Sequence, residues 1–551
     1  MRVTRRHFFF SFFFLFLFAL IFSSCALEKA QTLSSQNSGG NNSQGTTTSE
    51  IVGNDITPLS LNNSSVTVPL EGGKEAILLV VSADPLSSVQ SFQLTTPQNP
   101  KTLTKFLSAD TEEDTEEDLH MLLRNLESEI PEGTPLAESQ TKFLTRYLKI
   151  GDSRDFKVIK SFTSKDEYTV VTATLVYEHE DFEVFLDSRD LQRLSSSEIQ
   201  EIFDNFAQVL PKEFEFFGEP SDIDKNSKFT VLLTQEVNKM GELYNALVTG
   251  WFFGIDLFAS QVYPASNGME IFYGMVPDPN GEVGPATHDL IMKENIIPSY
   301  LVHELQHLIS FGQHVIKNKT MSEANWLNED ISHLIEDIHP PRTDSEEIYS
   351  ENYMVETGLE NPSRVSTFLA DIDRVCFLGC SAGLQERGGG YLFLRYAYEM
   401  IEFGILENLE EFLDYDLPLD GKEFLQRLLD GKQIGLNNLK YALFGDESAD
   451  QALSDLVGLF ALTIYFAGSD ELSDPLFSIK GINLRGASSD NRGTMLNGPA
   501  VISATQFPLT GILEGFSMAY VKVSGQDIAN QGGELTLEVS DSKRFKAYLI
   551  Q

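Results

Sequence analysis

Cysteine, tryptophan and basic residues are scarce in this sequence. Its 551 residues include three cysteines and two tryptophans, and 40 Lys and Arg stand against 81 Asp and Glu, for a formal charge of −41. A surface this negative repels phosphate groups, which excludes nucleic acid as a partner. Three cysteines are too few for a disulfide-dense scaffold or a four-cysteine zinc site, so the fold depends on hydrophobic cores.

Long hydrophobic runs are also missing after the N-terminal region. The longest later run, from Leu456 to Gly468, is too short to span a bilayer and is typical of a buried helix. A hydrophobic fraction of 42% is nevertheless ample for globular folding. A chain of this length exceeds what one core supports, so two to four domains are expected.

The first residues have the layout of an export signal. Three arginines precede an apolar stretch from Phe8 to Phe22, and two serines then lead to Cys25. The run FSSCA around Cys25 resembles a bacterial lipobox, with phenylalanine where leucine is usual. This resemblance implies a lipoprotein signal peptide at 1–24, a lipid on Cys25 that attaches the protein to a membrane, and a location in the bacterial cell envelope, exposed outside the cytoplasm. The alternative is an ordinary secretory signal that happens to contain a cysteine.

Composition divides the rest of the chain into four regions. Residues 25–54 are dominated by Ser, Thr, Asn, Gln and Gly and predict a flexible tether. Short β-rich runs predict an N-terminal β-rich domain at 55–145. Strands and helices mix in a catalytic body at 146–475, and strands return in a C-terminal β domain at 476–551. The expected fold class is therefore α+β, with a mixed sheet and a helical subdomain flanked by two small β-rich domains.

A helix predicted at 298–311 carries a His-Glu-x-x-His motif. His303 and His307 lie about 40° apart on this helix, one turn from each other, while its leucines occupy the far side. Two imidazoles so placed can bind one Zn²⁺. Glu304 lies about 100° around the helix from His303, where its carboxylate can take a proton from water at the metal. The alternative is a helix whose two histidines face solvent.

A second helix, predicted at 323–338, supplies a third candidate ligand. Glu329, His333 and Glu336 share the side of this helix that is opposite its leucines and isoleucines. Two histidines and one glutamate leave a fourth zinc position for water, as in catalytic zinc sites. The spacing between His307 and Glu329 allows the second helix to return antiparallel to the first, so that both polar sides meet at the metal.

These two helices resemble a known family of enzymes. HELQH followed by NWLNEDISHLIED is similar to the gluzincin metallopeptidases and most closely to the hyicolysin family, and the likeness extends over about residues 150–475. It implies a gluzincin-like metallopeptidase domain, Zn²⁺ as cofactor and a protein or peptide as substrate. Carried over by position, it implies His303, His307 and Glu329 as metal ligands and Glu304 as the general base.

Three residues near this motif need separate interpretation. Asp330 follows Glu329 where the family usually has glycine, and it adds negative charge behind the ligands. His333 is a hydrogen-bond partner behind the ligands, an extra ligand or a surface histidine, and the first and last of these are favoured. Tyr391, which follows three glycines, is the candidate donor to the oxyanion formed during peptide cleavage, the alternative being an aromatic residue packed in the core.

Three further features each leave two interpretations open. The run DIDKN from Asp222 has the start of a calcium loop, but a tight turn stabilised by its own side chains is the simpler interpretation. Cys376 and Cys380 form either a small disulfide loop or two buried thiols. The strand at 269–276 is either a sheet edge that pairs with an extended peptide or an ordinary interior strand.

The sequence therefore predicts a membrane-anchored, zinc-dependent endopeptidase that acts outside the cytoplasm. The alternative is a catalytically weak or inactive peptidase-fold lipoprotein that acts as a protein-binding adhesin, with turnover impaired by Asp330. A purely structural lipoprotein is a third interpretation, and it would hold no stoichiometric metal.

Overall fold

The computed structural model of the chain describes residues 56–70, 73–84, 88–100, 119–137, 148–338, 361–468, 475–480, 482–486 and 494–551. The predicted signal peptide, Cys25 and nearly all of the tether therefore lie outside the described residues. The described residues belong to one compact unit, Thr47–Gln551. Within these ranges, no helix combines the length and the apolar character needed to cross a membrane.

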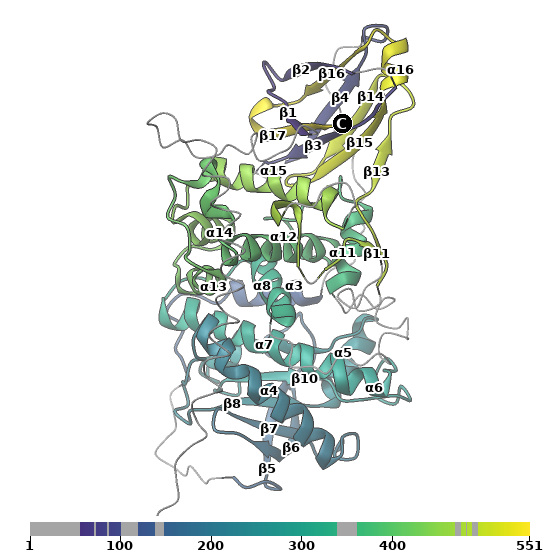
Figure 1. The fold of residues 1–551 in the computed structure, drawn as a ribbon. Helices are drawn as coiled ribbons and strands as arrows, with labels where there is room; N and C mark the ends of the chain where they lie inside the picture. The colour runs from purple at the N-terminus through teal and green to yellow at the C-terminus, as the bar shows by residue number, and fades with distance from the viewer. Residues whose placement is uncertain are drawn as a thin grey trace, which may run out of the picture. The chain divides into compact units, whose positions relative to one another are not determined.

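A mixed sheet of six strands organises the region that was predicted as the catalytic body (Figure 1). In spatial order its strands are β5 (Ser153–Ile159), β6 (Tyr168–Glu178), β7 (Phe182–Asp187), β8 (Phe229–Leu233), β10 (Ile271–Gly274) and β9 (Gly250–Phe252). The pairs β7·β8 and β8·β10 are parallel, and the other pairs are antiparallel. The predicted strand at 269–276 is thus interior, and the sheet edge next to it is β9.

Helix α4 (Ser196–Phe217) connects the parallel strands β7 and β8, since such a pair needs a long crossover. Ser195 caps its first turn in a capping box with Glu198, and a stripe of apolar residues faces the protein interior. The helix contacts β6 of the sheet and α7 (Ile297–Phe311). It therefore helps to hold in place the helix that carries the His-Glu-x-x-His motif.

Two further sheets form a β-sandwich. The five-stranded sheet has the order β1 (Ile56–Pro58), β17 (Phe545–Ile550), β3 (Glu75–Ser82), β15 (Met518–Ser524) and β13 (Val501–Ser503). The four-stranded sheet has the order β14 (Leu509–Leu513), β4 (Gln90–Thr95), β16 (Glu534–Val539) and β2 (Ser65–Pro69). Leu78 and Val80 of β3 belong to the core that the two sheets share, whereas Leu79 and Val81 belong to the larger core of the helices and the mixed sheet.

The N-terminal and C-terminal β-rich segments, expected as two flanking domains, hydrogen-bond to each other throughout the sandwich. β3 lies between β15 and β17, and β4 lies between β14 and β16. Alternating apolar residues reveal a half-buried strand but do not identify its partner, which is why the sequence suggested two modules. Helix α3 (Leu119–Ser128), which follows β4 in the chain, lies outside the sandwich and contacts β9 of the mixed sheet.

The remaining described helices surround α7 and the sandwich. They include α8 (Asn325–Ile338), α11 (Asn361–Ala370), α12 (Leu384–Glu402), α13 (Gly421–Asp430), α14 (Gly435–Phe444) and α15 (Asp450–Phe466). Helix α8 contacts α7 and α12, and α15 contacts β3 and β17 of the sandwich. The buried helix expected around Leu456 corresponds to α15, and the mixture of helices with several sheets agrees with the expected α+β class.

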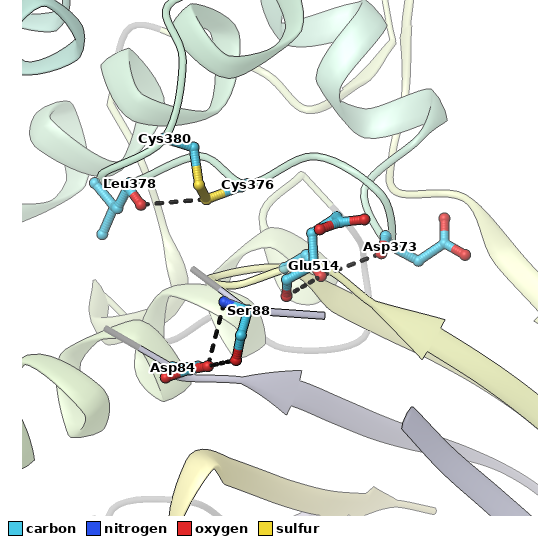
Figure 2. The surroundings of a disulfide bond; sticks show 8 residues. Asp84, Ser88, Asp373, Cys376, Leu378, Cys380 and Glu514 are labelled. Carbon is cyan, nitrogen blue, oxygen red and sulfur yellow. Dashed lines mark hydrogen bonds between the residues drawn. A yellow bond between two sulfur atoms is a disulfide. The ribbon is translucent and has the colours of Figure 1, made fainter. Parts of the chain in front are cut away.

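Cys376 and Cys380 form a disulfide in the loop between α11 and α12 (Figure 2), which decides between the two interpretations of this pair. The same loop meets the start of β15. The Ser517 hydroxyl lies 3.1 Å from the carbonyl oxygen of Asp373 and 2.9 Å from that of Glu514 (Figure 2). The backbone amide of Met518 donates to the carbonyl of Ile372 at 3.2 Å. The loop is therefore joined to the C-terminal strands.

Candidate metal centre

Two glycines opposite each other in the sheet let α7 approach closely. Gly250 of β9 pairs with Gly274 of β10. A Cβ atom at Gly250 would lie 2.8 Å from the Tyr273 carbonyl and 3.4 Å from Cγ of Glu304, and one at Gly274 would overlap the ring of Tyr300. Larger residues at this pair would therefore push α7 away from the sheet.

Both ends of α7 continue into wider helical turns. The π-helical turns η2 (Met292–Ile296) and η3 (Gly312–Lys317) precede and follow it. A wider turn before Pro298 accommodates a residue that has no amide hydrogen and whose ring crowds the preceding turn. Gly312, which directly follows the predicted helix at 298–311, keeps right-handed helical angles (φ −58°, ψ −45°). The sequence thus located α7 but not these π turns.

Helices α7 and α8 run antiparallel at the centre, an arrangement that the spacing of their residues allows. His303 contacts Glu336, whereas His307, one turn later in α7, contacts Ser332, one turn earlier in α8. His303 is 6% exposed, and His307 and Glu329 are at most 1% exposed. The histidines therefore face the protein interior, which excludes the alternative in which they face solvent.

Two imidazole nitrogens and the carboxylate of one glutamate converge at the site. Nε2 of His303 and Nε2 of His307 are 3.1 Å apart, and they lie 3.4 Å from Oε2 and from Oε1 of Glu329, respectively. Ligands about 2.0–2.1 Å from a tetrahedral Zn²⁺ are separated by about 3.3 Å, because a tetrahedron's edge is about 1.6 times its centre-to-corner distance. The separations between the two imidazoles and the carboxylate are thus close to those between ligands of one zinc ion, and the residues present fit the metal.

Glu336 fixes the orientation of the His303 ring. Its Oε1 atom lies 2.7 Å from Nδ1 of His303 and 3.0 Å from Nδ1 of His333. Burial alone would raise the pKa of Glu336, but the charge of His333 and the hydrogen bonds from both imidazoles hold its pKa well below the usual range. An ionised Glu336 that accepts a hydrogen bond from the Nδ1–H group of His303 leaves the lone pair of Nε2 free for a metal.

Glu336 was recognised in the sequence only as part of the polar side of α8. Its spacing of seven residues from Glu329 returns it to the same side two turns later, which is the signal that could have identified it. His333, expected either behind the ligands or at the surface, lies behind them and is 1% exposed.

A second set of potential ligands overlaps the first. His303, His333 and Glu336 also have ligand atoms within 4.8 Å of one another. However, the 2.7 Å and 3.0 Å separations between Glu336 and the two imidazoles are hydrogen-bond distances, shorter than the edge of a zinc tetrahedron. The geometry favours His303, His307 and Glu329 as the metal-binding set, with Glu336 and His333 supporting them.

Glu304 is buried between α7 and the edge strand. It is 1% exposed, and its Oε2 atom accepts a 2.7 Å hydrogen bond from the backbone amide of Phe252 in β9. Burial raises the pKa of Glu304 to about 7, against the opposing charges of His303 and Arg124. A carboxylate whose pKa lies near neutrality can both accept and return a proton.

Two buried arginines beside Glu329 were not identified from the sequence. Nη1 of Arg387 lies 3.0 Å from Oε2 of Glu329, and Nε of Arg124 lies 4.0 Å from Oε1. Arg387 directly precedes the glycine run that was noted in the sequence. Arg124 belongs to α3, far from the motif in the chain, and no local pattern could have linked it to the site. Both charges favour the ionised form of Glu329, the form that binds a cation.

The structure does not place Tyr391 where the sequence analysis expected it. Its hydroxyl donates a hydrogen bond to Oδ2 of Asp337. Asp337 lies eight residues after Glu329, about 12 Å farther along α8. Tyr391 is 1% exposed, and burial together with the charge of Asp337 raises its pKa well above its usual value. It is thus a core residue of α12, and the sequence could not show which way its ring points.

Asp330 points toward α12. A Cβ atom at Gly390 would overlap the carboxylate of Asp330, so the missing side chain of Gly390 makes room for Asp330. Burial raises the pKa of Asp330 well above its usual value, and the charge of Arg387 opposes that shift. Asp330 therefore lies at the interface of α8 with α12. Its position gives no support to the expectation that it impairs turnover.

A cavity of about 510 Å³ lies at the end of α3 that follows Arg124. Glu127, which binds Arg124 at 2.6 Å and accepts a 2.5 Å hydrogen bond from the amide of Gly254, forms part of its wall. The other walls come mainly from apolar residues, namely Ile130, Leu136, Phe258, Phe311, Val315 and Ile316. Because its walls are mainly apolar, the cavity is a candidate pocket for an apolar side chain.

Comparison with known proteins gives one partial similarity. No family model matches the chain. The chain is 29% identical over 201 residues to the neutral metalloprotease ShpI of Staphylococcus hyicus, a match that covers 36% of this chain and 43% of that protein. The chain thus aligns with less than half the length of that relative. This likeness supports a metallopeptidase, which is consistent with a buried cluster of two histidines and a glutamate.

Proposed function

We propose that the protein is a zinc-dependent endopeptidase of the gluzincin type, close to the hyicolysin family. The observation that carries this proposal is the convergence of His303, His307 and Glu329, whose imidazole nitrogens are 3.1 Å apart and each lie 3.4 Å from one of the two carboxylate oxygens. The partial similarity to a neutral metalloprotease supports the same reaction class. A protein or peptide is the proposed substrate.

In this proposal His303, His307 and Glu329 hold the metal, and Glu336 keeps the His303 ring in its binding orientation. Zinc, when bound, would polarise the scissile carbonyl and make a water molecule more acidic. Glu304 would take a proton from that water and deliver it to the nitrogen of the departing amine. The amide of Phe252 holds the carboxylate of Glu304 in position for both steps.

The edge strand β9 is the proposed place for the substrate backbone. An extended peptide can add to a sheet edge through main-chain hydrogen bonds. At this edge the carbonyl of Phe252 accepts a 3.2 Å hydrogen bond from Nη2 of Arg124, and the amide of Gly254 donates to Glu127. A peptide that binds here therefore competes with Arg124 and Glu127 of α3 for the backbone groups of β9 and the residues that follow it.

Glu304→Gln is the substitution that tests the proposed reaction. Glutamine keeps the size of the side chain and an oxygen that accepts from Phe252, but it cannot take up the proton. We expect cleavage of unfolded casein to fall at least about 100-fold, the usual contribution of a general base, while about one zinc per chain is retained. Casein digestion and zinc analysis of the purified chain measure the two effects.

A matched control is Glu402→Gln, which alters a glutamate at the exposed end of α12 and should keep both activity and zinc. Retention of full activity by Glu304→Gln would contradict the proposed role of Glu304. Wild-type protein that binds zinc and casein without cleaving casein would support the alternative, a protein-binding adhesin with a peptidase fold. Wild-type protein without stoichiometric metal would contradict both functions.

We propose further that the protein is anchored in the bacterial cell envelope by a lipid on Cys25, which lies outside the described residues. The lipobox-like run FSSCA and the polar segment that follows it support this proposal. Mass spectrometry of the membrane fraction should show lipid on Cys25, and Cys25→Ser should move the protein to the soluble fraction. Membrane attachment that persists unchanged in Cys25→Ser would contradict the anchor.

A further inference from the structure

A second cluster of potential ligands lies outside the candidate metal centre. Asp222 and Asp224 belong to the loop between α4 and β8, and Glu270 immediately precedes β10. One carboxylate oxygen from each of the three residues lies within 4.8 Å of the others. Oxygen ligands about 2.4 Å from one Ca²⁺ are separated by at most about 4.8 Å, the distance between ligands on opposite sides of the ion. The three carboxylates can therefore share one calcium ion.

Glu270 is the member of the cluster whose surroundings indicate a bound cation. It is 1% exposed, and its Oε1 atom accepts hydrogen bonds from the Ser221 hydroxyl at 2.7 Å and from the Ile223 amide at 2.9 Å. Its Oε2 atom is buried and receives no hydrogen bond from any residue that the structure describes. A buried carboxylate oxygen without a donor is unfavourable unless a cation or a proton satisfies it.

Two nearby basic side chains pair with carboxylates outside the cluster. Nη1 of Arg154 lies 3.8 Å from Oε1 of Glu183, and Nζ of Lys228 lies 2.8 Å from Oε1 of Glu178. Burial raises the pKa of Glu270 to about 7, and the charge of Asp224 adds to this effect. Burial also raises the pKa of Asp224, although the charge of Arg154 opposes the shift. The three carboxylates thus repel one another in a partly buried place.

We propose that Asp222, Asp224 and Glu270 bind a structural calcium ion. The donor set consists of oxygen atoms only, which suits Ca²⁺ and not the imidazole-rich chemistry of zinc. The sequence showed only the Asp-x-Asp-x-Asn start of this site. Its buried carboxylate comes from Glu270, more than forty residues later, which sequence spacing could not reveal.

The site would connect three elements near the candidate metal centre. The loop that contains Asp222 also carries Glu219, whose carbonyl accepts a 3.1 Å hydrogen bond from the side chain of Gln313, just after α7. A Cβ atom at Gly312 would lie 3.3 Å from the amide nitrogen of Ser221. Calcium would therefore hold the loop against the start of β10 and support the C-terminal end of α7. This inference is independent of the proposed peptidase function.

Calcium titration of the full, zinc-saturated chain tests the proposal. Isothermal titration calorimetry should show about one Ca²⁺ per chain with a Kd below about 1 mM, and the Tm should rise by several degrees in about 2 mM CaCl₂. Glu270→Gln and Asp224→Asn should each weaken calcium binding at least about tenfold and abolish the rise in Tm. In zinc-containing buffer from which calcium has been removed, both variants should have a Tm equal to or above that of the wild type, because each substitution removes a repelling charge.

The control is Asp166→Asn, which removes one negative charge from an exposed turn and should leave calcium binding unchanged. Three outcomes would overturn the proposal. They are a wild-type chain that does not bind calcium, undiminished binding by Glu270→Gln, and an equal rise in Tm with Mg²⁺ in place of Ca²⁺. Because the readouts are calcium binding and Tm, loss of peptidase activity would not affect the result.

Discussion

Individual side chains around the candidate zinc site differ in charge because their neighbours differ. Hydrogen bonds to Glu329 and Glu336 outweigh burial and raise the pKa of His303 to about 9. Burial and the charge of Arg124 lower the pKa of His307 to about 3. Near neutral pH without a metal, the two imidazoles, 3.1 Å apart, therefore carry one positive charge between them, on the doubly protonated ring of His303. A metal has to displace that proton from His303, so zinc affinity depends on how His303 is held.

Glu336→Gln tests how far the outer carboxylate supports the metal. The substitution removes the negative charge that orients and polarises His303, while an amide of similar size remains. Carboxylates behind metal-ligating histidines typically change affinity by about 10–100-fold, so we expect the zinc Kd to rise within that range. Competition with a chromophoric chelator measures the Kd, and circular dichroism checks the fold.

For Glu336→Gln, the matched control is Glu399→Gln on α12, where Oε1 pairs with Arg395 at 3.0 Å instead of with a histidine. It should leave the zinc Kd unchanged. A Glu336→Gln variant that binds zinc as tightly as the wild type would show that the 2.7 Å contact does not hold His303 for the metal.

At the scale of single elements, periodicity predicted most helices and strands but not how they approach each other. The helices predicted at 298–311 and 323–338 correspond to α7 and α8, and their spacing in the chain allowed the antiparallel arrangement of the two helices. The pairing of Gly250 with Gly274, which seats α7 on the sheet, depends on register between two strands. Register is a tertiary property, so local sequence could not predict it.

The errors at this scale have the same physical origin. Tyr391 lies within α12 and not at its start, and its hydroxyl binds Asp337, because the direction of a side chain depends on how α12 packs against α8. Arg124 lies near Glu329 because α3 leaves the β-sandwich and inserts beside β9. Local motifs identify residue types and spacing, whereas these two positions are set by contacts between segments distant in the chain.

For the whole chain, the main consequence of the topology is that its two β-rich ends depend on each other. The N-terminal strand β3 has two strand neighbours, and both come from the C-terminal segment. That segment also contacts the helical region. The Tyr520 hydroxyl donates to the carbonyl of Ala461 at 2.6 Å, and Met518 belongs to the core of the helices and the mixed sheet. Neither β-rich segment completes its sheets alone.

Truncation after residue 500 tests this dependence. The deletion removes β13 to β17, so β3 and β4 lose every strand partner that the structure describes, and their buried apolar residues become exposed. Losing that many backbone hydrogen bonds and apolar contacts exceeds the roughly 5–15 kcal/mol that stabilises a typical domain. We therefore expect insoluble protein, or a soluble fragment whose Tm is at least about 10 °C lower.

Deleting residues 26–50, part of the predicted tether, is the control and should leave the Tm unchanged. A truncated chain with the wild-type Tm and zinc content would show that the candidate metal centre folds without the C-terminal strands.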